Sequence, residues 1–366
     1  MTPVPTDFPA PTVTLAMIVK DEEETLGACL ASVAGHVDEI VIVDTGSRDA
    51  TKSIARRFTD RVLTYRWHDD AATARQFAFD QATSAWVCWL DADDVVAGAE
   101  ELRGILGGLE PEVDAILWPY VCTRDAWGAP RQIEWFVRCI RTDGPYRWVY
   151  PVHELLVAAR PTVTRWKPEI VVEHHPEQRS GGRDPARYLA RIRAAAQDDD
   201  PRMLFILGHE EAGAGNRDEA IAAFGRLLMA EGGDPYWYQA EIWIGKLHIG
   251  AQRHDAAIDA YLAALARDPS WPDAYFGLAE VYYYGRDWAK VVHWTDFGRK
   301  IPAPATIARF DPLRYAHGWI IQYTNALFHL GRVEEALAWT RTALGYDPDD
   351  VWHRENLRRF SGSVRM

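Results

Sequence analysis

The strongest constraint on the fold of this chain is a repeat in its C-terminal half. Asp-Pro dipeptides end at Pro201, Pro235 and Pro269, two successive intervals of 34 residues, and Pro302 follows 33 residues later. Between them recur short runs of small residues that close on an aromatic ring, such as RDEAIAAF, HDAAIDAY and RVEEALAW. Small residues at fixed places let paired helices approach closely, and the ring fills the adjacent groove. The period therefore predicts stacked helical hairpins.

The N-terminal half follows a different pattern, in which short apolar runs alternate with helical segments. Strands are expected at 13–19, 39–43, 61–65 and 86–90, with a helix at 71–81 before the last of them. This alternation predicts a mostly parallel sheet with right-handed crossovers. Shorter strand-like runs between 113 and 175 predict antiparallel strands that complete the same domain.

A Gly-rich and charged segment at 178–185 separates the two patterns. We therefore expect an α/β domain at 1–180 and an all-α domain at 181–366. The 34-residue period of the second domain resembles the tetratricopeptide repeat, which stacks helix pairs into an extended surface.

Composition narrows the functional classes. Of 366 residues, 48% are apolar and 25% charged, which excludes a disordered chain, and the formal charge of −13 argues against a dominant nucleic-acid-binding surface. No apolar run is long enough to span a bilayer, and the N-terminus lacks the charged and apolar parts of a secretory signal. The four cysteines have no C-x-x-C spacing, so we expect buried free thiols and a cytoplasmic location.

The most informative motif is the acidic run Asp91-Ala92-Asp93-Asp94, directly after the strand expected at 86–90. Two unit charges about 5 Å apart repel by roughly 3 kcal/mol at an effective dielectric near 20. A divalent cation offsets that repulsion, and oxygen ligands suit Mg²⁺ or Mn²⁺. The alternative is a solvated acidic turn that caps the next helix.

Polar residues also follow the other strands, where parallel sheets bind ligands. Asp44 at the end of the second strand suits a ribose hydroxyl or a base N–H, and Asp49 is expected to cap the following helix. Arg75, on the helix before the acidic run, is placed to reach a phosphate or to form a surface salt bridge. The remaining candidates at these strand ends are Lys20, Asp21, Glu22, Thr45, Gly46 and Ser47.

In the order and spacing of the segments KDEEETL, VDTGSRDAT, ATARQFAFDQA and LDADD, residues 10 to 180 resemble the family 2 glycosyltransferases of the GT-A fold. The resemblance implies a nucleotide-sugar donor, most often a UDP-sugar, a divalent metal (Mn²⁺ or Mg²⁺) on the D-x-D motif, and inversion at the anomeric carbon. Carried over by position, it implies that Asp21 or Glu22 and Asp44 face uracil and ribose. Arg75 and Ala92 would lie near the nucleotide.

The same resemblance implies a metal site. Asp91 would face the ribose and contribute to the metal site, and Asp93 would bind the metal. A histidine late in the domain often serves as a further ligand in this fold, which makes His174 or His175 a candidate.

An inverting transfer also needs a base that deprotonates the acceptor. Glu154 is the preferred base because a carboxylate usually fills this role in the family, and His153 beside it is a candidate for orienting the acceptor. The structural alternative is a partly buried hydrogen-bonded pair. Rings in the same segment suit either sugar stacking or core packing, namely Trp118, Tyr120, Trp135, Phe136, Tyr146, Trp148 and Tyr150.

The combination of both halves resembles bacterial family 2 enzymes with tetratricopeptide tails, among them peptide S-glycosyltransferases. This resemblance implies a peptide or protein acceptor, with the repeats docking it or forming a homodimer. Three alternatives stay open: a glycan or lipid-linked acceptor, a modified DNA base, and a non-catalytic interaction protein built on the repeats.

Overall fold

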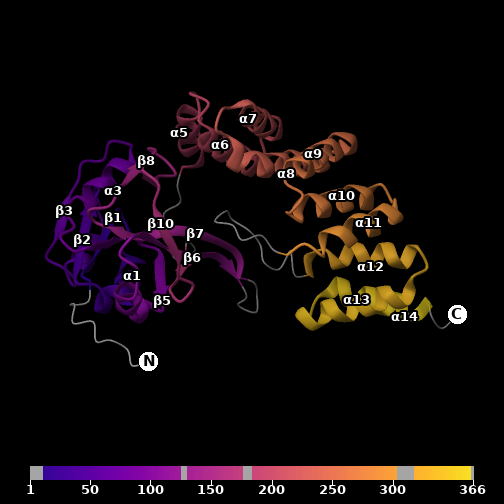
Figure 1. The fold of residues 1–366 in the computed structure, drawn as a ribbon, viewed down its shortest axis with the longest axis horizontal. Coiled ribbons are helices and arrows are strands. Elements are labelled where there is room, and N and C mark those ends of the chain that lie inside the picture. The colour runs from indigo at the N-terminus through magenta and orange to yellow at the C-terminus, as the bar shows by residue number, and fades with distance from the viewer. Residues whose placement is uncertain (1–10, 125–129, 176–183, 303–316, 364–366) are drawn as a thin grey trace. The chain divides into compact units, whose positions relative to one another are not determined.

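The computed structural model describes residues 11–124, 130–175, 184–302 and 317–363. Within them the chain forms two compact units, one ending at Asp184 and the other beginning at Pro185 (Figure 1). Most of the segment expected to separate two domains, 178–183, lies outside the described residues.

The first unit is built on a curled sheet in the order β3-β2-β1-β4-β7-β6-β11-β5, with β10 also paired to β6 and a separate β8–β9 hairpin. Its strands are β1 (Val13–Val19), β2 (Glu39–Asp44), β3 (Val62–Thr64), β4 (Trp86–Cys88), β5 (Asp94–Ala97), β6 (Val113–Arg124), β7 (Pro130–Arg141), β8 (Tyr146–Val149), β9 (Leu155–Ala158), β10 (Val163–Trp166) and β11 (Val171–His174). Strands β1 to β4 pair in parallel, as predicted.

The later strands differ in part from the expectation. Antiparallel pairing joins β7 to both β4 and β6, and joins β11 to β5. Strands β10 and β11, however, run parallel to β6. Parallel neighbours need a long connection, and here β7 and the β8–β9 hairpin provide it between β6 and β10.

Side chains alternate across β1 and so divide the apolar core between the two faces of the sheet. Leu15 and Met17 pack with Leu26 and Leu30, whereas Ala16 packs on the other face. Each fully buried aliphatic side chain contributes about 1.5–3 kcal/mol. The helical segments of this unit are α1 (Leu26–Val33), η1 (Ala34–His36), α2 (Thr51–Ala55), α3 (Ala71–Phe79), η2 (Ala99–Glu101) and α4 (Leu102–Gly107).

The second unit is helical, which confirms the predicted all-α class. Consecutive helices pack in pairs, α6 on α7, α8 on α9, α10 on α11 and α12 on α13. Its helices are α5 (Pro185–Ala195), α6 (Pro201–Gly213), α7 (Arg217–Met229), α8 (Asp234–Gly250), α9 (His254–Arg267), α10 (Asp273–Tyr284), α11 (Trp288–Gly298), α12 (Ile320–His329), α13 (Val333–Tyr346) and α14 (Val351–Ser363). Across the residues that the structure describes, no helix is both long and apolar enough to cross a lipid bilayer.

Residues that recur in the repeats cap helices or allow helices to pack closely. Asp200 caps α6, because its carboxylate accepts a hydrogen bond from the Met203 backbone N–H at 2.9 Å, and Pro201 takes the first helical turn, where no N–H is needed. Tyr261 packs against two glycines: a Cβ on Gly245 or Gly277 would come within 2.6 or 2.4 Å of its ring. Close helix approach therefore depends on these small residues.

Candidate active site

The carboxyl ends of β1, β2 and β4 meet at one edge of the sheet, because these strands are parallel neighbours. Val19 at the end of β1 is in register with Asp44 at the end of β2. The acidic run that follows β4 reaches the same edge. The sequence-predicted residues of three separate segments are thus brought together by the topology.

The turn after β2 is built around Asp44, which is fully buried. Its carboxylate accepts hydrogen bonds from the backbone N–H groups of Gly46 and Ser47 at 3.2 and 3.1 Å. Gly46 adopts a φ of 117°, which favours glycine. Thr45 Oγ1 donates to the Val19 carbonyl at 3.1 Å, so the turn is fastened to β1.

The segment after β1 is hydrogen-bonded to that turn. The backbone N–H of Asp21 donates to Ser47 Oγ at 3.0 Å, and Arg48 N–H donates to Asp21 Oδ1 at 2.8 Å. Glu22 is buried beside the exposed Lys20 and Asp21. These candidates therefore form one continuous polar rim.

Asp49 differs slightly from its predicted role in this rim. The N-cap of α2 is Ala50, one residue later than predicted. Asp49 Oδ1 still accepts a hydrogen bond from the backbone N–H of Thr51, the first residue of the helix, at 3.0 Å. Its carboxylate thus satisfies a helix-end donor from one position further out.

Arg75 on α3 joins the acidic run to the predicted base. Its Nη2 lies 2.5 Å from Asp91 Oδ1, and its Nε donates to Glu154 Oε1 at 2.7 Å. The guanidinium stacks on the rings of Trp89 and Trp148, at 4.8 and 5.1 Å from their centroids. Only 6% of the surface of Arg75 is exposed, so its ion pairs are buried and are not the surface salt bridge that was the alternative. Among the described residues, its buried Nη1 has no hydrogen-bond partner.

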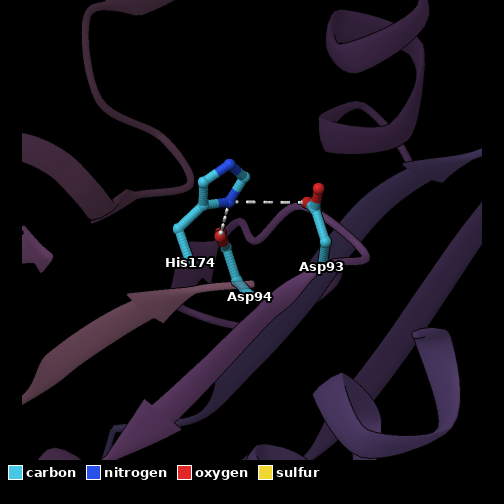
Figure 2. A group of neighbouring side chains, drawn as sticks. All are labelled: Asp93, Asp94 and His174. Atoms are coloured by element: carbon cyan, nitrogen blue, oxygen red, sulfur yellow. Dashed lines mark ion pairs between the residues drawn. The ribbon is translucent and has the colours of Figure 1, made fainter. Parts of the chain in front are cut away.

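A candidate cation site lies at the start of β5. Asp93, Asp94 and His174 each offer one ligand atom, and these atoms lie within 4.8 Å of one another. Figure 2 shows the imidazole of His174 turned toward both carboxylates, with Nδ1 3.4 Å from Asp94 Oδ1 and 3.8 Å from Asp93 Oδ1. The strand register brings these side chains together, because His174 of β11 pairs with Asp94 of β5.

The donor set fits a divalent metal ion. Asp94 Oδ1 and His174 Nδ1 are both buried and make no hydrogen bond within the described part of the chain. Buried polar atoms are ordinarily satisfied, and two carboxylates with an imidazole are ligands that Mn²⁺ and Mg²⁺ accept. Of the predicted ligands, Asp93 and His174 are in this group. Asp91 faces Arg75 instead, and its role as a ligand stays a prediction.

Comparison with known proteins identifies the family of the N-terminal domain, which contains the sheet edge described above. Residues 14–157 match the family model described as Glycosyl transferase family 2, and residues 244–290 match a Tetratricopeptide repeat model. The N-terminal unit is a family 2 glycosyltransferase domain. The predicted resemblance and the predicted pair of fold classes are confirmed.

Several curated proteins are similar to the chain. A TPR repeat-containing protein of Synechococcus elongatus is 31% identical over 269 residues, which cover 69% of this chain and 66% of the relative. The glycosyltransferase SunS of Bacillus subtilis is 30% identical over 118 residues, covering 30% of this chain and 28% of SunS. LpsC of Rhizobium meliloti, a lipopolysaccharide core biosynthesis glycosyltransferase, is 34% identical over 106 residues, covering 28% and 38%. The chain thus spans less than two thirds of the length of each of these relatives.

Similar solved structures each cover less than half of the chain. The crystal structure of MamA has a TM-score of 0.37 at 18% identity and covers 44% of this chain and 82% of that one. Glucosyl-3-phosphoglycerate synthase from Mycobacterium tuberculosis, solved with Mg²⁺ and uridine-diphosphate, has a TM-score of 0.27 at 19% identity, covering 30% and 44%. At these scores the likeness carries no inference about ligands.

Neighbouring charges shift the pKa values of His174 and Asp91 in opposite directions. Burial by itself lowers the pKa of His174, but Asp94, Asp93 and Asp91 outweigh it, so that pKa is raised. Burial by itself raises the pKa of Asp91, but Arg75 beside it, with help from Arg138, holds that pKa below its usual range. Both shifts follow from opposite charges at short distance.

Sequence reasoning did not identify two residues of the candidate site, Asp94 as a possible ligand and Arg138 as the partner of Asp94. Asp94 was the third carboxylate of the acidic run, with no assigned role. Arg138 lies in the middle of β7, where an arginine inside the apolar run IEWFVRCI is a signal that a buried charge needs a partner. That partner is Asp94, 3.1 Å from its Nη1.

The aromatic residues of the glycosyltransferase domain divide between core and surface. Trp118, Tyr146 and Trp148 are buried, as core packing requires. Trp135 is half-buried, and its ring centroid lies 4.6 Å from that of the exposed Trp166. His153, which adopts a φ of 51°, directly precedes Glu154 in the segment between β8 and β9.

Proposed function

We propose that the protein is an inverting, metal-dependent glycosyltransferase that moves a sugar from a UDP-sugar to a side chain of a peptide or protein. The observation that carries this proposal is the convergence of two charged groups at one sheet edge. Asp93, Asp94 and His174 form the first group, and the Arg75 ion pairs with Asp91 and Glu154 form the second.

The rim of the sheet supplies donor-binding groups. The buried carboxylate of Asp44 holds the turn around it in a fixed arrangement, and the polar backbone of that turn suits the hydroxyls and N–H groups of a nucleoside. Asp21 and Glu22 lie on the same rim. Asp93, Asp94 and His174 would hold a Mn²⁺ or Mg²⁺ ion, which when bound stabilises negative charge on the leaving diphosphate.

Glu154 is the proposed base. The acceptor hydroxyl or thiol transfers its proton to a carboxylate oxygen of Glu154 as its own oxygen or sulfur bonds to the anomeric carbon. The bond from that carbon to the diphosphate oxygen breaks, and its electron pair leaves on the nucleoside diphosphate. Arg75 holds Glu154 in one orientation, and the orientation of a base is a large part of its efficiency. The buried Nη1 of Arg75 is a further donor beside this group.

A thermal-shift panel of nucleotide sugars, each with and without Mn²⁺, tests the donor. A ligand that binds only the folded protein raises Tm, and at equal concentration a tighter ligand raises it more. We expect the largest rise with a UDP-sugar plus Mn²⁺ and a smaller one with either alone. No rise with any sugar nucleotide would refute the proposal.

A second acceptor class has its own support, because the similar protein LpsC is named for lipopolysaccharide core biosynthesis. A glycan or lipid-linked acceptor is therefore the alternative to a peptide. Binding of an unglycosylated peptide library against lipid-linked core glycans separates the two. Dimerisation through the repeats, a cytoplasmic location and the absence of a nucleic-acid partner stay predictions.

A further inference from the structure

Arg138 is a buried, positively charged residue that contacts Asp94 of the candidate metal site. The proposed chemistry gives Arg138 no role. Only 1% of its side chain is exposed. Its Nη1 lies 3.1 Å from Asp94 Oδ2 and 3.5 Å from the Trp89 carbonyl oxygen. A charge this deeply buried carries a large desolvation penalty unless it is held by a partner. Asp94 is that partner.

Trp89 contacts both buried arginines of the site. The guanidinium of Arg138 lies 3.8 Å from the centroid of the Trp89 ring, and that of Arg75 lies 4.8 Å from it. The indole Nε1 donates to the Val137 carbonyl at 2.7 Å, which fixes the ring against β7. Each arginine therefore holds one carboxylate of the acidic run, Arg75 holding Asp91 and Arg138 holding Asp94.

The two oxygens of Asp94 have different surroundings. Oδ2 accepts from Arg138 Nη1 and from the backbone N–H of Asp91 at 3.0 Å. Oδ1 makes no hydrogen bond within the described part of the chain and faces His174 Nδ1 at 3.4 Å. The contacts from Arg138 and from the Asp91 backbone thus both hold Oδ2 and leave Oδ1 for a cation.

We propose that Arg138 is a positioning residue of the cation site, which orients Asp94 so that Oδ1 faces Asp93 and His174. This inference rests on the proposed function, because it takes those three residues to bind the metal. Arginine suits the task better than lysine, since its planar guanidinium stacks on aromatic faces, here at 3.8 and 4.8 Å from the ring centroids of Trp89 and Tyr120. A lysine would keep the charge and lose this planar stacking.

The test is isothermal titration of Mn²⁺, without donor, into the full-length chain and its Arg138→Lys variant. We expect the affinity of Arg138→Lys for Mn²⁺ to fall at least about tenfold. Arg141→Lys is the matched control on the same strand, because Arg141 donates to the Val113 and Pro111 carbonyls and stacks on Trp86, away from the acidic run. Its affinity should stay within about twofold of wild type.

Wild-type affinity in a folded Arg138→Lys variant would overturn the inference. Asp94→Asn covers the case in which Arg138→Lys does not fold, because it removes the charged group through which Arg138 is inferred to act. A comparable loss of affinity supports the part of the inference that places Asp94 in the cation site, and unchanged Mn²⁺ binding refutes the inference. Where both single variants fold, the double variant should lose no more affinity than Asp94→Asn alone.

Asp93→Ala separates this inference from the proposed function. If Asp93→Ala loses Mn²⁺ binding while Arg138→Lys keeps it, only the role of Arg138 is wrong. If Asp93→Ala binds Mn²⁺ as the wild type does, or the wild type binds none, the cation site itself is refuted and the role of Arg138 with it.

Discussion

The two units bury charge in opposite ways. In the glycosyltransferase domain, most of the buried acidic and basic side chains gather at one edge of the sheet, namely Glu22, Asp44, Arg75, Asp93, Asp94 and Arg138, whereas Asp114 pairs separately with Arg160. Among the described residues of the helical unit, the buried charged side chains are Glu211 and Glu241, and each lies beside one arginine, Arg193 and Arg267. Gathered charge is costly to fold and useful for catalysis, whereas dispersed pairs only satisfy local groups.

Packing shows the same contrast. The helical unit is held together mainly by close packing of its side chains; for example, the Tyr261 ring fills the space left by Gly245 and Gly277. The sheet edge gains its order from hydrogen bonds to charged groups, as at Asp44 and Arg75. Substitutions at the sheet edge of the glycosyltransferase domain should therefore change activity most, and substitutions in the helical unit should change stability most.

Asp93→Ala should have the largest effect. We expect metal-dependent turnover of the sugar nucleotide to fall about 10³-fold, because a preorganised charge at the leaving group is removed. Donor hydrolysis with and without Mn²⁺ measures this. Asp255→Ala, at an exposed position on α9, is the control and should leave turnover unchanged. Activity of Asp93→Ala within a few-fold of wild type would mean that the metal site lies elsewhere.

Glu154→Gln should come next. The amide keeps a hydrogen-bond acceptor for Arg75 but accepts no proton, so transfer to the acceptor should fall about 10²-fold or more. Donor binding, followed by thermal shift, should be retained. Full transfer activity in this variant would assign the base to another residue.

Gly277→Ala tests whether shape orders the helical unit. The added Cβ would lie 2.4 Å from the Tyr261 ring, so we expect a loss of about 1–3 kcal/mol of unfolding free energy. Gly225→Ala is the matched control, because nothing lies within 4 Å of its added Cβ, and it should be neutral or stabilising by up to about 1 kcal/mol. Scanning calorimetry measures both variants. Equal stability of the two would contradict the packing argument.

Arg193→Met should have the smallest effect. Hydrogen bonds from Arg193 outweigh the opposing effect of burial and, with Asn216, hold the pKa of Glu211 below its usual value. Because the folded pKa is lowered, the stabilisation is present above the unfolded pKa of about 4.3 and is lost as pH falls through the folded value.

For Arg193→Met we therefore expect Tm to fall by about 2 °C at pH 7 and the difference from wild type to shrink at pH 3. Arg253→Met is the control, because its ion pair with Asp218 is exposed and should contribute almost nothing. A difference from wild type that stays constant from pH 7 to pH 3 would mean that Glu211 is not the group responsible.

Local sequence patterns predicted the elements well where a strand was long and apolar. The strand expected at 39–43 became β2, because burial on both faces of a parallel sheet selects such apolar runs. The direction of β10 and β11 was not predictable in the same way, because it depends on how many strands intervene and not on the residues within them.

The sequence by itself determined the two fold classes, the acidic run after β4 and the polar turn around Asp44, since each depends on residues close together in the chain. The tertiary structure alone decided the partners of the acidic run. His174 reaches Asp94 through the pairing of β11 with β5, and Arg138 reaches it from β7. These residues are 80 and 44 positions from Asp94 in the chain, and only strand pairing, which follows from the whole sheet, fixes such contacts.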